Sequence, residues 1–302
     1  MTSSVAALPE RSEAATGASA DFVVVGAGIA GAVIARLLVE AGRRVTVVAG
    51  GGGASHAPAA VVNPVRAKRG KPVPDAALAL AEARDLYRRF TRLHLGLYHR
   101  VPEEARERWE RNLRGSGLGH RWQGARLLLP EAFWLRPRPL LRALLSGIPL
   151  LRDRVLLPEP GGVWLASGRF LRGTVVWAAG AEGAGVLEER PALTAGSLLL
   201  VAEPGDGGIR EVFHAGGVVG GTYRPLERFA EPVPTAGELE ELIQKAARLA
   251  GRPPTPLGVF SGVRYRRRPP FGEAPFGLYF SGFGSTALLF APLFARRLLG
   301  VL

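Results

Sequence analysis

Cysteine is absent from the 302 residues of the chain, and there is a single methionine. Without cysteine the protein forms no disulfide, no thiolate metal site and no thiol redox centre, and it can attach no cofactor through a cysteine sulfur. A chain that needs no disulfides is typical of a reducing compartment. The composition therefore favours a cytoplasmic location.

Long apolar runs are missing as well. No stretch reaches the roughly 18 uncharged apolar residues that a membrane-spanning helix needs. The most apolar segment, 285–299, is interrupted by Pro292 and by the pair Arg296 and Arg297. We therefore expect no contact with a membrane. The first twenty residues also lack the positive start and apolar block of a signal peptide, and we expect residues 1–19 to be a disordered tail.

Lysine is scarce in a strongly basic chain. Lys68, Lys71 and Lys245 are the only lysines among 39 basic residues, which leaves 36 arginines, and with 26 acidic residues the formal net charge is +13. Such a charge attracts polyanions, so a nucleic-acid partner is one hypothesis. The arginines are scattered along the chain, however, as solvated surface charges usually are. Nucleic-acid binding is therefore disfavoured.

The five histidines show no spacing typical of a metal site, and the sequence predicts no bound metal. No Ser-His-Asp arrangement can be derived from spacing either. With 47% hydrophobic residues the chain can nevertheless bury a substantial core. These features indicate a globular enzyme whose chemistry is not carried by a metal or a nucleophilic triad.

The most informative segment runs from residue 21 to residue 53. It begins with FVVV over 22–25, a short apolar, β-branched run that ends in the glycine motif GAGIAG over 26–31. Apolar residues then recur at helical spacing as far as Gly42, and VTVV over 45–48 predicts a second buried strand. This order of strand, glycine turn, helix and strand is the βαβ unit that binds dinucleotides.

Each glycine of that motif has a backbone role. Gly26 permits the tight turn, Gly28 lets the chain approach a pyrophosphate closely, and Gly31 lets helix and strand pack together. Ile29 and Ala30 open the helix, whose N-terminus presents free N–H groups and a positive dipole to the phosphates.

One part of the motif is missing. The residue after the second strand is normally an Asp or Glu that accepts hydrogen bonds from the adenosine ribose, and here it is Ala49. No acidic residue occurs between Ala41 and Pro74, and glycines fill positions 50–53. Loss of a charge-assisted hydrogen bond costs roughly 1.5–3 kcal/mol, or about ten- to a hundredfold in affinity. The ribose is therefore held either by another group or poorly, and in the second case we expect the nucleotide to be lost during purification.

Two later segments again combine a strand with glycines. Residues 173–180, GTVVWAAG, predict a buried strand that ends on Ala179 and Gly180. Residues 277–280 predict another strand, and GFGST over 282–286 predicts a glycine turn into a helix over 287–299. Free N–H groups at such a helix start suit a phosphate or an electron-rich ring oxygen.

Taken together, these segments resemble the D-amino-acid-oxidase-like superfamily of FAD-dependent oxidoreductases, which includes glycine oxidase and sarcosine oxidase. The resemblance covers nearly the whole chain and depends on the order of the motifs in segments 23–48, 52–64, 174–183, 218–225 and 262–298. Segment 55–64, SHAPAAVVNP, is most similar to a poorly characterised bacterial branch. The resemblance implies an FAD cofactor and oxidation of the C–N bond of a small amine or amino acid, with hydride transfer to flavin N5.

The resemblance also implies roles for single residues of the cofactor site. The three motif glycines and Ser55 lie near the FAD phosphates, His56 lies in the segment beside the flavin, and the amides of 282–286 approach the pyrimidine side of the flavin ring. The predicted cofactor site consists of Gly26, Gly28, Ile29, Ala30, Gly31, Ala49, Ser55, His56, Ala179, Gly180, Gly282, Gly284, Ser285 and Thr286.

Two residues are implied on the substrate side. Arg264, in GVRY, matches the family's G-x-R-P element, whose arginine holds the substrate carboxylate in members that oxidise amino acids, and a guanidinium suits that contact. The alternative is that Arg264 is one more solvated arginine beside those of 266–268. Tyr223, in GGTYRP, matches an element that borders the substrate cavity, where the tyrosine either touches substrate or, as we favour, packs in the interior. Tyr265 stands in place of the family's proline, so the substrate class stays open.

The predicted architecture is α/β: a Rossmann-type FAD-binding domain of the glutathione-reductase type, interleaved with a smaller mixed α/β substrate domain that contains an antiparallel sheet. We assign residues 20–72, 152–190 and 258–302 to the first and 73–151 and 191–257 to the second. Outside the nucleotide motifs we expect helices over 76–95 and 238–250, irregular sequence up to Gly124, a short helix within 127–145, and strands over 197–202 and 218–223.

Three functions stay open at this point. The first is an FAD-dependent oxidoreductase for a small amine or amino acid, with an unidentified electron acceptor, and the intact glycine motifs favour it. The second is a degenerate relative that binds FAD weakly and acts through interactions, which Ala49 and the altered segment 265–271 favour. The third is a basic flavoprotein that acts on tRNA, which the arginine excess favours only if it gathers on one face.

Overall fold

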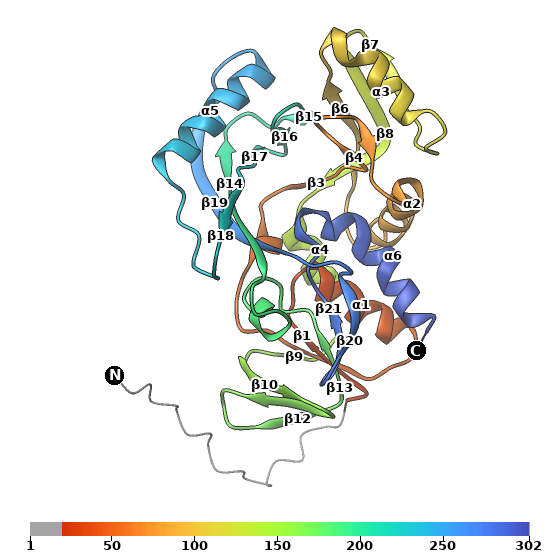
Figure 1. Ribbon diagram of the computed structural model, residues 1–302, viewed down its shortest axis with the longest axis vertical. Helices are drawn as coiled ribbons and strands as arrows, with labels where there is room; N and C mark the ends of the chain where they lie inside the picture. Colours follow the sequence, from red (N-terminus) through yellow and green to blue (C-terminus); the bar gives the residue numbers. More distant parts are fainter. Residues whose placement is uncertain (1–19, 302) are drawn as a thin grey trace.

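The computed structural model describes residues 20–301, and two large β-sheets organise it (Figure 1). The first has six strands in the order β20-β21-β13-β1-β2-β9, in which the only antiparallel pair is β20 with β21. These strands are β1 (Phe22–Val25), β2 (Val45–Val48), β9 (Leu150–Leu151), β13 (Thr174–Trp177), β20 (Phe271–Ala274) and β21 (Gly277–Phe280).

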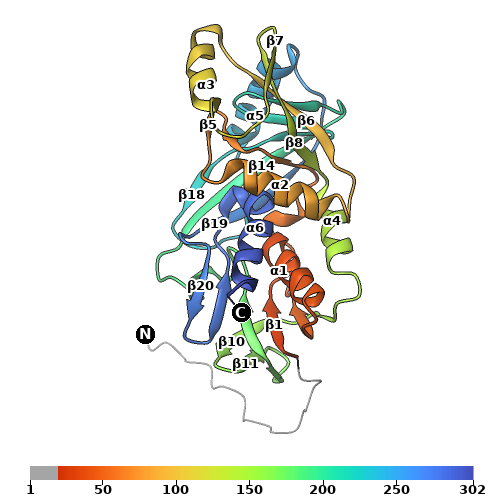
Figure 2. The same cartoon turned by 90° about the vertical axis from the view of Figure 1, so that its right-hand side faces the viewer.

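Both faces of this sheet are covered, which explains why its central strand is apolar throughout. Val24 of β1 packs into a core formed with the helices, whereas Val23 and Val25 point to the other face and pack with a three-stranded sheet. The helices of the first face are α1 (Ile29–Glu40), α2 (Ala76–Tyr87), α4 (Pro137–Leu144) and α6 (Ala287–Leu299). The small sheet consists of β10 (Val155–Glu159), β11 (Gly162–Leu165) and β12 (Phe170–Arg172). Figure 2 shows α1, α2 and α6 packed side by side.

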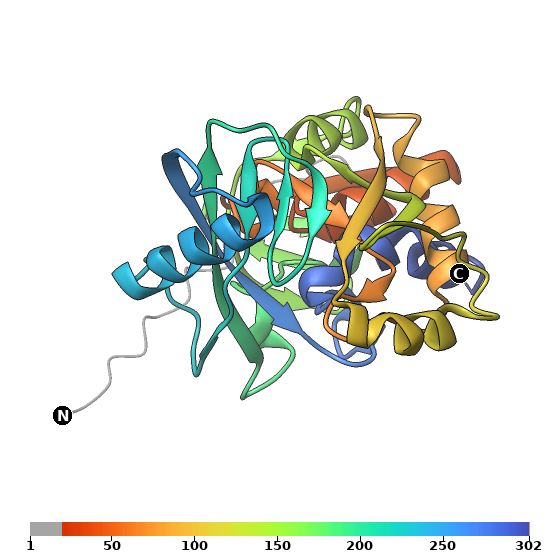
Figure 3. The ribbon, with the colours of Figure 1, turned by 90° about the horizontal axis from the view of Figure 1, so that it is seen from above.

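The second large sheet has ten strands and is mainly antiparallel, with β15 and β6 as a parallel pair. Helix α5 (Ala236–Ala250) packs on β14 at its outer side (Figure 3), and a capping box between Thr235 and Glu238 starts that helix. The strands are β3 (Ala60–Val62), β6 (His94–Arg100), β7 (Arg121–Gln123), β8 (Arg126–Leu135), β14 (Ala192–Val201), β15 (Asp206–Ile209), β16 (Phe213–Ala215), β17 (Val218–Gly220), β18 (Arg224–Leu226) and β19 (Pro256–Arg266).

The remaining elements are peripheral. Strands β4 (Val65–Arg66) and β5 (Lys71–Pro72) form a hairpin next to α3 (Arg106–Leu113). Within residues 20–301 no helix has the length and apolar character needed to cross a membrane. The predicted disordered tail, 1–19, lies outside the described residues.

The predicted α/β architecture, a Rossmann-type unit with a second, largely antiparallel sheet, is confirmed. Strand β1, helix α1, strand β2, strand β21 and helix α6 fall where the sequence placed them. The domain boundaries stay a prediction, and the two sheets exchange short segments across them. Strand β9 pairs with β2 of the first sheet, whereas β3 and β19 belong to the second sheet.

Two predictions about the intervening segments were wrong. The helix expected over 76–95 ends at Tyr87, and residues 94–100 form strand β6, in which Leu97 and His99 are buried in alternation. A period of two is a strand signal, and the preceding helical pattern concealed it. The segment expected to be irregular up to Gly124 contains helix α3, whose only buried residues are Trp109 and Leu113. One buried pair among charged residues gives too weak a helical pattern to recognise.

Candidate active site

A cleft of about 810 Å³ opens at the carboxyl ends of the parallel strands of the six-stranded sheet. Its walls come from the turns after β1, β2, β13 and β21 and from residues 260–265 of β19. Ligands of open α/β sheets bind at this edge, and the volume is in the range of small-molecule sites. The fold therefore brings together, in one cleft, the turns that the sequence marked as separate motifs.

The GAGIAG turn forms the floor of the cleft where β1 passes into α1. Gly26 has φ +108°, and a Cβ on Gly31 would lie 1.8 Å from the carbonyl oxygen of Gly26, so only glycine lets the turn close. Gly28 precedes α1 and carries no side chain to cap it. The first turn of α1 thus meets the cleft with its backbone, and Gly28, Ile29 and Ala30 line it. Gly31 is buried behind them.

Ser55 and His56 belong to a 3₁₀ helix, η1 (Ala54–His56), that faces this turn. The Ser55 hydroxyl accepts a hydrogen bond from the backbone N–H of Ile29 at 3.1 Å, at the N-terminus of α1. His56 lines the cleft, and its carbonyl oxygen accepts a hydrogen bond from Arg138 Nε at 2.9 Å. Burial, together with the nearby charge of Arg138, lowers the pKa of His56 below its usual value, so the ring is neutral at pH 7.

The other two glycine turns complete this part of the cleft. Ala179 and Gly180 line it after β13, and Gly282 and Gly284 line it after β21. Ser285 and Thr286, which the sequence assigned to the site, do not belong to the lining. They form the 3₁₀ helix η4 (Gly284–Thr286) with Gly284, and the Thr286 hydroxyl donates to the carbonyl of Phe283 at 2.8 Å. Their contribution is to the turn that precedes α6.

Ala49 also lies outside the lining. Its backbone N–H donates to the carbonyl of Leu151 on β9 at 3.0 Å, and the side chain offers no polar group. Residues 50–53, all glycine, line the cleft in its place.

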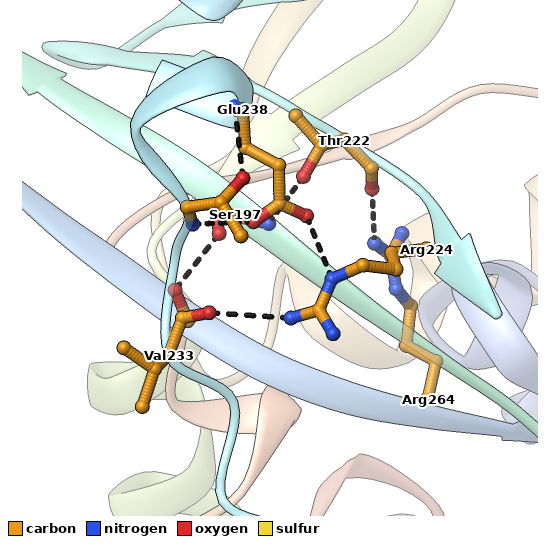
Figure 4. Close-up of polar contacts among 8 residues, drawn as sticks. Ser197, Thr222, Arg224, Val233, Glu238 and Arg264 are labelled. Atoms are coloured by element: carbon orange, nitrogen blue, oxygen red, sulfur yellow. Dashed lines mark hydrogen bonds and ion pairs between the residues drawn. The ribbon is translucent and has the colours of Figure 1, made fainter. Parts of the chain in front are cut away.

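Arg264 reaches the cleft from β19 and is half-buried. One guanidinium nitrogen donates to the carbonyl of Thr222 at 2.9 Å (Figure 4), and the guanidinium carbon lies 4.5 Å from the centre of the Tyr223 ring. Within residues 20–301 Arg264 has no carboxylate within ion-pair distance. A half-buried cation without an acidic partner is suited to bind an anionic group of a ligand.

Tyr223 is placed differently from our expectation. Its side chain is 66% exposed rather than packed in the interior, and it is not among the residues that line the cleft. Tyr265, the residue after Arg264 in β19, is buried, and burial raises the pKa of its hydroxyl to about 12. Tyr223 therefore holds the Arg264 guanidinium on its ring face, and Tyr265 keeps a protonated hydroxyl at neutral pH.

Several lining residues escaped the sequence analysis. Arg138 comes from α4, and Asp153 and Arg154 follow β9. Phe229, Glu231 and Pro232 come from the segment before α5. Figure 4 shows how the last segment is held: the guanidinium of Arg224 bonds both Glu238 of α5, at 3.4 Å, and the carbonyl of Val233, at 3.2 Å. None of these positions carries a local motif, because tertiary structure alone brings them to the cleft. In the described part of the chain no group of His, Asp and Glu is arranged to hold a metal ion.

Comparison with known proteins agrees with this geometry. The family model described as "FAD dependent oxidoreductase" matches residues 21–299, whereas a search of curated proteins found no match. Similar solved structures include iminodiacetate oxidase from Chelativorans sp. (22% identity, TM-score 0.77, 93% of this chain and 94% of that chain covered). Glycine oxidase from Geobacillus kaustophilus is also similar (20%, 0.75, 93% and 94%), as is L-proline dehydrogenase from P. horikoshii (16%, 0.73, 92% and 91%).

The described residues fit FAD. The first turn of α1 begins without a side-chain cap, so its N–H groups and dipole suit a diphosphate. The Ser55 hydroxyl is already at that helix end, and glycine turns after β2, β13 and β21 line the cleft beside it. Because the family model spans almost the whole described chain, this protein belongs to the FAD-dependent oxidoreductases.

Proposed function

We propose that this protein oxidises the C–N bond of a small amino acid or related amine that carries a carboxylate. The observation that carries the proposal is Arg264, a half-buried guanidinium that lines the flavin cleft and has no acidic partner in the described chain. The neighbours named above as glycine oxidase, iminodiacetate oxidase and L-proline dehydrogenase support the same class of substrate.

FAD supplies the acceptor for the hydride when it is bound. The residues of the chain have other tasks. Arg264 holds the substrate carboxylate, and its bond to the Thr222 carbonyl and its contact with the Tyr223 ring fix the direction of the guanidinium before substrate arrives. Phe229, Pro232 and Phe260 line the cleft on that side. A neutral amine is then held over the cofactor without a catalytic acid or base.

The first experiment is a visible absorbance spectrum of the purified protein before and after FAD is added, followed by an anaerobic screen of amines and amino acids. The proposal expects flavin bands that bleach with a carboxylate-bearing amine. Flavin bands that no such compound bleaches would contradict it.

The role of Arg264 is tested with Arg264→Ala. A lost charge-assisted contact of roughly 1.5–3 kcal/mol predicts a KM about ten- to a hundredfold higher for the amino acid. The same variant is expected to leave the affinity for FAD unchanged. Arg268→Ala is the matched control, because Arg268 is exposed and lies outside the cleft lining. Equal KM values for the two variants would show that Arg264 does not bind substrate.

A further inference from the structure

Strand β2 ends without the acidic residue that reads the adenosine ribose in dinucleotide-binding folds, but a carboxylate lies at the same edge of the sheet. Strand β9 runs parallel to β2, with Leu151 opposite Val48, and the next residues turn at Asp153. The carbonyl oxygen of Asp153 is 3.6 Å from the position that a Cβ on Gly50 would take. Asp153 is therefore the neighbour of the segment that would normally carry the ribose contact.

Three acidic residues line the cleft, and only one of them is at this end. Glu182 follows β13, and Glu231 lies in the segment before α5, on the side of the second sheet. Asp153 is the acidic lining residue beside the glycines of 50–53, whose lack of side chains leaves its approach to the cleft open.

The Asp153 carboxylate is fixed in place. Its Oδ2 accepts a hydrogen bond from the Ser167 hydroxyl at 2.6 Å, and its Oδ1 accepts one from the backbone N–H of Arg154 at 2.7 Å. The bond from Ser167 is the main reason that the pKa of Asp153 lies below its usual value, so the group is ionised at neutral pH.

This carboxylate also has acceptor capacity left. An ionised carboxylate offers about four acceptor positions. The Ser167 hydroxyl and the Arg154 N–H use one on each oxygen, and the Ser167 backbone also contacts the group. No Lys or Arg side chain comes within ion-pair distance of Asp153 in residues 20–301. The charge is therefore available to a hydroxyl donor from a ligand.

We propose that Asp153 accepts hydrogen bonds from the hydroxyl groups of the adenosine ribose of FAD and so replaces the acidic residue that is absent at position 49. A ribose offers two neighbouring hydroxyl donors, and an oriented, ionised carboxylate is the acceptor that binds them best. The inference concerns the cofactor and goes beyond the proposed function. A failure to find an amine substrate would leave it unaffected.

The test measures FAD affinity rather than turnover. The full-length chain, freed of flavin, is titrated with FAD and with an FAD analogue that lacks the adenosine 2′-hydroxyl, and flavin fluorescence reports binding. The native protein is expected to bind the analogue about tenfold more weakly than FAD. In Asp153→Ala the Kd for FAD is expected to rise about ten- to a hundredfold, and the preference for FAD over the analogue is expected to disappear.

A second substitution makes the test specific. Ala49→Glu introduced into Asp153→Ala restores the acid at its usual position and is expected to recover most of the lost FAD affinity. Asp206→Asn is the control, because Asp206 begins β15 and lies outside the cleft lining. The ratio of its Kd for the analogue to its Kd for FAD should equal that of the native chain. A preference for FAD that persists in Asp153→Ala would overturn the proposal.

Thermal melting without flavin shows whether Asp153→Ala still folds. If it does not, Asp153→Asn and Ser167→Ala replace it, since the first keeps the shape of the side chain and the second removes only the bond that orients it. The proposal then expects a reduced preference for FAD in both variants, and an unchanged preference in both would overturn it.

Discussion

The two ends of the cleft are built in different ways. At the nucleotide end the chain offers mostly backbone, through the glycine turns that contain Gly26, Gly28 and Gly180 and through the four glycines of 50–53. At the opposite end the lining consists of side chains from distant segments, among them Arg264, Phe260 and Phe229. A backbone site is encoded by a short local motif, whereas a side-chain site depends on how strands far apart in the sequence are brought together.

The comparison explains what could be concluded about function. The nucleotide end identifies the cofactor because a diphosphate needs little more than N–H groups and close approach. The substrate end determines which molecule is oxidised, and its residues follow no fixed spacing. The sequence therefore led to the cofactor class and left the substrate open.

The largest expected effect is at the nucleotide end, in Gly31→Ala. The new Cβ would lie 1.8 Å from the Gly26 carbonyl oxygen, and backbone atoms cannot move aside as the end of a side chain can. We expect a loss of about 3 kcal/mol of stability and no FAD retained after gel filtration, measured by melting temperature and by absorbance. Gly237→Ala is the control, since nothing lies within 4 Å of a Cβ at that position. Normal flavin content in Gly31→Ala would show that the turn can move the Gly26 carbonyl away from a Cβ at position 31 and still bind FAD.

The substrate end is disturbed selectively by Gly196→Ala. A Cβ on Gly196 of β14 would lie 1.8 Å from a guanidinium nitrogen of Arg264 and 2.5 Å from the Thr222 carbonyl oxygen. The guanidinium must then leave its position. We expect a KM for the amino-acid substrate about ten- to a hundredfold higher, with FAD affinity unchanged.

The matched control for that variant is Gly258→Ala in β19, where a Cβ meets nothing within 4 Å. If Gly196→Ala releases FAD as readily as Gly31→Ala does, the two ends of the cleft are not independent and the comparison fails.

The same contrast separates what the sequence could predict from what it could not. Strand β1 and helix α6 were predicted with the observed bounds, and helix α1 to within two residues of its end, because glycines mark their ends and their apolar patterns are continuous. Strand β6 was missed because its signal, the alternate burial of Leu97 and His99, spans few residues. Its first two residues were assigned to the preceding helix and the others to irregular sequence.

Within the site, the glycines of the three predicted turns line the cleft and their contact with the cofactor stays a prediction, whereas the cleft-lining residues Arg138 and Asp153 were not predicted. Arg138 reaches the cleft because α4 packs against η1, and Asp153 reaches it because β9 extends the first sheet beyond β2. No local sequence motif indicates either of these two contacts. The exposed position of Tyr223 was missed for a related reason, since β17 ends at Gly220, three residues before the tyrosine.

Polar groups that are buried away from the cleft affect the stability of the protein rather than the binding of a ligand. His99 of β6 is 1% exposed, and burial lowers its pKa to about 3. The unfolded chain binds a proton at this residue below its ordinary pKa of about 6.5, while the folded chain does not. The contribution of His99 to the free energy of unfolding is therefore constant above that pH, and it falls by about 1.4 kcal/mol per pH unit as the pH is lowered from about 6.5 towards 3.

His99→Gln is the variant that tests this slope, because glutamine keeps a polar group near Asn63, the partner of the His99 ring at 3.3 Å, but does not titrate. Denaturant unfolding of both proteins at pH 8, 7, 6 and 5 measures it. Their difference in stability should be constant at the two higher values and should shrink at pH 5. Parallel pH profiles would mean that His99 has the same pKa in the folded and the unfolded protein.

The smallest expected effect concerns Tyr87 of α2, on the helical face of the first sheet. Its side chain is fully buried, and its hydroxyl has no hydrogen-bond partner among the described residues. A buried polar group without a partner costs about 1–3 kcal/mol, so Tyr87→Phe is expected to raise the free energy of unfolding by about 1 kcal/mol, while the cofactor site stays intact.

Tyr98→Phe is the control, because Tyr98 is only half-buried and its hydroxyl can be hydrated. A loss of stability in Tyr87→Phe that is absent in Tyr98→Phe would mean that a partner, such as a buried water molecule, holds the hydroxyl. The helical layer behind the nucleotide end would then contain a polar contact of the kind that the apolar pattern of α2 does not indicate.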